Sequence, residues 1–128
     1  MRRLVAAAIL FVVSSTLDNI TTYEFVVVRG EYVEANPFLV PFIYTQPLHI
    51  WFLRDALLLA LLVVEALAFR WLLLRLYRRR PQAQALMKLA DSHWVIVAAA
   101  ALFKAAAAAH NLLLVTLDIE TPLPQLLT

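Results

Sequence analysis

Ionisable and amide side chains interrupt three long apolar segments of this chain of 128 residues. Asp18 stands in the first segment, Arg54 and Asp55 in the second, and Lys104 in the third. Charged groups are costly in the hydrocarbon of a membrane, so the default expectation is that they face protein and have partners or a function. They are the candidates for chemistry, together with the neighbouring polar residues Thr21, Thr22, His110 and Asn111.

Depth and helical face both allow these side chains to meet. At a rise of 1.5 Å per residue, Asp18 lies about 20 Å from the start of its segment, and Lys104 lies slightly less far along its own. Asp18 shares a helical face with Thr21 or Thr22, which follow it by three or four residues. Alanines beside Lys104 favour close helix approach. We therefore expect a cluster that faces protein, with Asp18 paired to Lys104 or to Arg54.

This cluster has more than one interpretation. Ion pairing would neutralise the charges and hold the helices together, whereas a pocket open to one side would bind an ion, a proton or a small ligand. A third possibility is contact with a partner protein. His49 and His110 are weak candidates for haem or metal ligands, because they stand on different helices towards the same side. No metalloprotease histidine pair or glycine elbow beside a serine is present, so the sequence predicts no catalytic residue and no cofactor.

The amino-acid composition indicates whether these residues lie in water or in a membrane. The chain is 63% hydrophobic and 16% charged, whereas a soluble domain is about half apolar and a quarter charged. Cysteine is absent from the sequence, which excludes a disulfide framework and a thiolate metal site. These values predict an integral membrane protein.

Three apolar runs would position the cluster. Helices are expected at about 4–28, 48–74 and 82–117, each long enough to cross a hydrocarbon core of about 30 Å. The first run begins like a signal peptide, but its apolar pattern continues through 25–28, so we expect a retained span. Pro81 suits the first turn of the third helix. The prediction is a single all-α membrane domain, 1–128, with three transmembrane helices, a structured outer loop at 29–47, a basic loop at 75–81 and an outer tail at 118–128.

Basic residues are distributed unevenly between the two sides. Arg2 and Arg3 precede the first helix, and four arginines follow the second, whereas Arg29 alone flanks the other side. The positive-inside rule then predicts a multi-pass protein of the cell membrane with a cytoplasmic N-terminus and an extracytoplasmic C-terminus. The loop arginines are expected to contact lipid headgroups rather than nucleic acid. They are Arg75, Arg78, Arg79 and Arg80.

The most distinctive motif combines residues 18–22 with Gly30 and a Glu-x-Asn-Pro sequence that begins at Glu34. On these residues the chain resembles a family of small prokaryotic integral membrane proteins classed as a domain of unknown function. The resemblance implies further hydrophobic helices and brings no established activity. Physically, Glu34 would bind Arg54 or Arg29, and Asn36 would cap a new element. The apolar stretch 37–44 is too short to span, so we expect it on the membrane surface or folded over the bundle.

These observations favour a non-catalytic protein. Three helices make a poor solitary channel or transporter, because a pathway must be lined on all sides. We therefore expect an accessory or structural subunit of a larger membrane assembly or of a homo-oligomer. Its partners would be membrane lipid and other membrane subunits or further copies of itself. The alternative is an ion-, proton- or small-ligand-handling protein that uses the polar cluster, and a haem- or metal-binding protein or membrane enzyme comes third.

Overall fold

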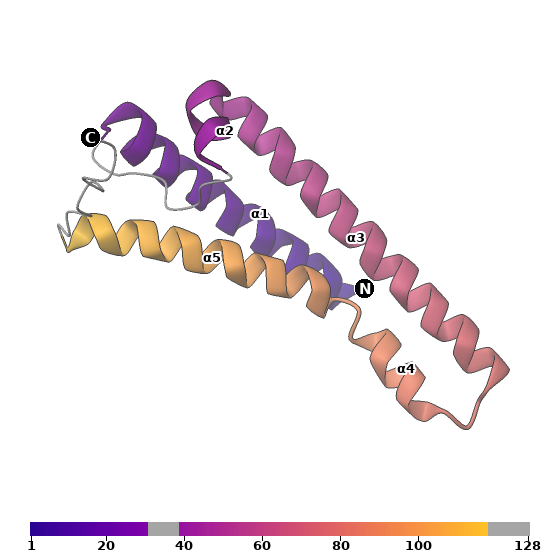
Figure 1. Cartoon of the computed structure of the whole chain (residues 1–128). Coiled ribbons are helices and arrows are strands. Elements are labelled where there is room, and N and C mark those ends of the chain that lie inside the picture. The colour runs from indigo at the N-terminus through magenta and orange to yellow at the C-terminus, as the bar shows by residue number, and fades with distance from the viewer. Residues whose placement is uncertain (31–38, 118–128) are drawn as a thin grey trace, which may run out of the picture.

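The computed structural model describes residues 1–30 and 39–117, and all regular structure within these ranges is helical. The chain contains α1 (Arg2–Thr22), a π-helical segment (Tyr23–Val28), α2 (Val40–Thr45), α3 (Leu48–Arg79), α4 (Gln84–Asp91) and α5 (Val95–Thr116). Figure 1 shows α1 lying between α3 and α5, with short α2 at one end of the bundle and α4 at the other.

Three of the helical stretches are long and apolar enough to cross a membrane: Arg2–Val28, Leu48–Arg79 and Gln84–Leu114. The protein is therefore an all-α, multi-pass membrane protein, as its sequence predicts. Their lengths of 27, 32 and 31 residues all exceed the roughly 20 residues that a span requires. Pro47 immediately precedes α3, a helix boundary that suits proline. Pro81 lies in a turn between α3 and α4 and not in the first turn of a helix as predicted, because α4 begins only at Gln84.

The third apolar stretch is broken, contrary to the prediction of one helix over 82–117. Ser92, His93 and Trp94 separate α4 from α5, although neither proline nor glycine is nearby. The Ser92 hydroxyl donates to the carbonyl of Leu89 at 2.8 Å, and His93 Nδ1 lies 2.9 Å from the carbonyl of Ala90. Side chains that bond to nearby carbonyls in this way compete with the helical ladder.

Helix α1 forms the centre of the bundle. Its most extensive contact is with α5, and it also packs against α3. Leu4 and Ala7 of α1 form a buried cluster with Ala66 of α3 and Val97 of α5. The small alanines let the three backbones approach closely, and this cluster holds the helices together near the start of α1.

A second apolar cluster closes the opposite end. Val26 of the π-helical segment, Ile43 of α2 and Trp51 of α3 are buried together. Trp51 Nε1 donates to the carbonyl of Gln46 at 3.1 Å, which satisfies the polar edge of the indole. The sequence predicts that the apolar stretch 37–44 lies on the membrane surface or folds over the bundle. Its described residues, 39–44, fold over the bundle. Gly30 adopts φ 66°, a left-handed conformation that suits glycine at a turn.

Candidate functional site

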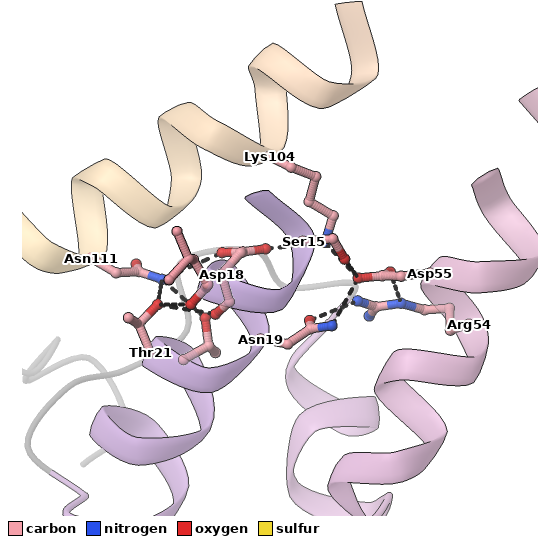
Figure 2. A network of polar contacts seen from close by, with 10 residues as sticks. Ser15, Asp18, Asn19, Thr21, Arg54, Asp55, Lys104 and Asn111 are labelled. Atoms are coloured by element: carbon pink, nitrogen blue, oxygen red, sulfur yellow. Dashed lines mark hydrogen bonds and ion pairs between the residues drawn. The ribbon is translucent and has the colours of Figure 1, made fainter. Parts of the chain in front are cut away.

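Polar side chains from α1, α3 and α5 meet at one level of the bundle (Figure 2). Two carboxylates, Asp18 and Asp55, and two cations, Arg54 and Lys104, are joined by ion pairs. The formal charges therefore sum to zero. We call these four residues the central polar network, together with their hydrogen-bonding neighbours Ser15, Asn19, Thr21, Thr22 and Asn111.

Asp55 is the most deeply buried charge of the network. Its side chain is 5% exposed, and it accepts hydrogen bonds from the Ser15 hydroxyl and from Asn19 Nδ2, the latter at 2.9 Å. Arg54 Nε donates to Asp55 Oδ1 at 2.9 Å, and Lys104 Nζ lies 3.1 Å from Oδ2. A buried carboxylate is tolerated only when it is paired and hydrogen-bonded, and Asp55 meets both conditions.

Asp18 forms the second half of the network, between α1 and α5. Lys104 Nζ donates to its Oδ2 at 3.0 Å, and Asn111 Nδ2 lies 3.4 Å from its Oδ1. The same amide nitrogen reaches the hydroxyls of Thr22 at 3.0 Å and Thr21 at 3.3 Å. Thr21 directs its own hydroxyl proton to the main chain of α1, so its lone pairs remain available to Asn111.

Lys104 joins the two halves. Its ammonium group lies 3.0 Å from Asp18 and 3.1 Å from Asp55, and its side chain is 13% exposed. An ammonium has three donors and no acceptor, which suits a position between two carboxylates. One side chain of α5 therefore connects α1 and α3 at the same level.

Helical spacing explains how α1 serves both neighbours. Ser15 and Asn19 are one turn apart and face Asp55 of α3, whereas Asp18 and Thr22 are one turn apart and face α5. The sequence-based site included the second pair and omitted the first. Ser15 and Asn19 have the same spacing of four residues as Asp18 and Thr22, so the sequence did contain a pattern that could have predicted the first pair.

The predicted ion pair between Asp18 and Lys104 is confirmed. The alternative partner, Arg54, pairs with Asp55 and stacks over the ring of Phe42 at 5.0 Å. His110, which was also expected in the cluster, is exposed on α5. Successive helical residues point about 100° apart, so Asn111 takes the inward position and His110 does not.

Two of the remaining candidates, Glu34 and Asn36, lie outside the described residues. His49 and His110 are both exposed, and the described part of the chain holds no group of three histidine, cysteine or acidic residues that could bind a metal ion. The four predicted headgroup residues are exposed at the end of α3: Arg75, Arg78, Arg79 and Arg80.

Comparison with protein-family models, curated proteins and solved structures finds no match to this chain. The resemblance to a small membrane protein family therefore stays a prediction. The central polar network thus has to be understood from its own geometry. It is neutral, it connects all three long helical stretches, and its carboxylates already have partners.

Proposed function

We propose that this chain is a non-catalytic subunit of a membrane assembly, either a homo-oligomer or a larger complex. The observation that carries the proposal is the position of Lys104 between Asp18 and Asp55. This arrangement fixes the register of three helices with a neutral set of charges, and polar contacts inside a membrane stabilise helix association. A subunit with a fixed shape can present its outer faces to a partner.

The same geometry argues against transport through the network. A carrier of ions or protons needs a charged group that can exchange its partner. Each of the four charges here has an opposite charge within 2.9–3.1 Å, and breaking a buried pair leaves an uncompensated charge at a cost of about 3–5 kcal/mol. Ion or ligand handling is therefore the less favoured function.

The outer surface of α3 supports an assembly. In the most apolar part of each stretch, Arg2–Val28 is 39% buried within the protein, whereas Leu48–Arg79 is only 11% buried. Glu65 is exposed on α3, next in sequence to Ala66 of the buried cluster, and makes no ion pair within residues 1–30 and 39–117. An ionisable side chain is costly against lipid, so a protein partner beside Glu65 would remove that cost.

The native mass of the chain, gently solubilised in detergent, tests this proposal. Wild type should run as an oligomer or with a copurifying membrane protein. Glu65→Leu should lose the partner without a lower melting temperature, because Glu65 has no described intrachain partner to lose. Lys88→Leu is the matched control, since it replaces an exposed charge on α4 and should keep the partner. A monomeric wild type that copurifies with an ion or small ligand would favour the alternative function.

Orientation is part of the proposal. Arg2 and Arg3 begin α1, and Arg78 and Arg79 lie in the last turn of α3. In the sequence between the first two long helices, from 29 to 47, Arg29 is the one basic residue. The positive-inside rule supports a cytoplasmic location for the arginine-rich end of the bundle. A reporter inserted near Gln82 should then be cytoplasmic, and one fused after Thr128 extracytoplasmic. A cytoplasmic signal from the second reporter would contradict the arrangement.

A further inference from the structure

A pocket lies at the end of the bundle where α1 begins, away from the central polar network. Its cavity volume is about 430 Å³, within the range of about 300–1,000 Å³ that is typical of ligand sites. Residues from three segments line it, because the start of α1 meets α3 and the junction between α4 and α5. The residues that matter here are Arg2, Arg3, Arg70, Asp91, His93 and Trp94.

The pocket carries an excess of positive charge. Three arginines face one carboxylate, Asp91, and none of these four side chains makes an ion pair within the described residues. Arg3 is positioned by Trp94, with its guanidinium 5.8 Å from the centre of the indole ring. Guanidinium groups bind phosphate through paired N–H donors, so the pocket has the chemistry of a phosphate site.

His93 provides a second observation. It is 4% exposed, and its Nε2 is buried without a hydrogen-bond partner in the described chain. Its Nδ1 lies 2.9 Å from the Ala90 carbonyl, which can only accept, so Nδ1 carries a proton. Nε2 is then an acceptor in the neutral ring or a donor in the charged ring. A phosphate monoester that reached Nε2 would satisfy either form, through its hydroxyl group in the first case and a phosphate oxygen in the second.

We propose that this pocket binds a phosphate ester, with an anionic phospholipid headgroup as its source. Exposed apolar side chains lie close in sequence to the residues that line the pocket. They are Val5, just after Arg3, Trp71, just after Arg70, and Val95, just after Trp94. Acyl chains would cover them while the phosphate enters the pocket. Basic pockets between membrane helices bind anionic headgroups in this way.

The test is lipid retention by the full chain in detergent, measured by native mass spectrometry with short-chain phosphatidic acid as the probe. Wild type should retain one lipid, and Arg70→Gln should weaken retention by about fivefold or more, because each arginine near a headgroup contributes about 1 kcal/mol. Lys88→Gln is the control. It removes an exposed cation of α4 that does not line the pocket and should change retention less than about twofold.

Equal losses in Arg70→Gln and Lys88→Gln would overturn the pocket, because general attraction to a basic surface would then explain binding. Competition separates the two sources of phosphate. Inorganic phosphate or glycerol phosphate that binds as tightly as the lipid would overturn the lipid source, whereas weak competition supports it. Arg2→Gln provides the same comparison should Arg70→Gln fail to fold, since Arg2 is exposed at the first position of α1.

Discussion

The chain gathers charge in two places, and the two places solve opposite problems. In the central polar network two carboxylates and two cations cancel, and every charge has a partner. In the pocket beside Arg70, three arginines face one carboxylate without an ion pair among the described residues. A neutral, satisfied cluster is suited to holding helices together, whereas an unbalanced one is suited to receiving a charge from outside. The comparison separates structure from binding within one small bundle.

The largest expected effect is at Lys104. Lys104→Met leaves two carboxylates against one cation, and an uncompensated buried charge costs about 3–5 kcal/mol. We expect a large fall in the free energy of unfolding, measured by chemical denaturation in detergent. Lys88→Met, at an exposed position of α4, should change it by no more than about 0.5 kcal/mol.

A second substitution in the Lys104→Met background sharpens this prediction. Asp55 keeps Arg54 as its partner, whereas Asp18 has no other cation among the described residues. Adding Asp18→Asn should therefore recover more stability than adding Asp55→Asn. Equal recovery, or purely additive losses in the double-mutant cycle, would show that Lys104 does not bridge the two carboxylates in the way the distances indicate.

An intermediate effect is expected at Asn111. Asn111→Ala removes the amide that contacts Asp18, Thr21 and Thr22 but leaves the ion pairs intact. Hydrogen bonds between transmembrane helices contribute about 0.6 kcal/mol each on average, so a loss of about 1–2 kcal/mol is expected. His110→Ala, at the exposed neighbouring position, should have little effect. Comparable losses from both variants would show that the hydrogen bonds of Asn111 are not the cause.

Much of the architecture could be predicted from the sequence because its signals are local. Three apolar runs, the prolines at 47 and 81 and the single glycine mark helices and turns by rules that need no tertiary information. The pairing of Asp18 with Lys104 could also be predicted, since depth in the membrane and charge restrict the choice of partners. Arg54 shows the limit of that reasoning, because its partner is its own neighbour Asp55.

The remaining features depend on contacts between segments. The break after α4 comes from Ser92 and His93 bonding to nearby carbonyls, and neither residue is a strong helix breaker by itself. The pocket could not be predicted from the sequence, because it depends on the packing that brings Arg70 of α3 close to Arg2 and Arg3 of α1. The sequence interpretation instead assigned headgroup binding to the arginines at 75 and 78–80, which cluster visibly along the chain.

The smallest expected effect is at Arg70 and tests the other side of the comparison. In detergent without anionic lipid, Arg70→Gln should change the free energy of unfolding by about 0.5 kcal/mol or less, because it breaks no described ion pair and reduces repulsion among like charges. With phosphatidic acid present, wild type should gain stability through ligand binding, and the variant should gain less. The measurement is the same denaturation series with and without lipid. A loss in lipid-free detergent as large as that of Lys104→Met would show that Arg70 is a structural cation, and the contrast between the two charge clusters would disappear.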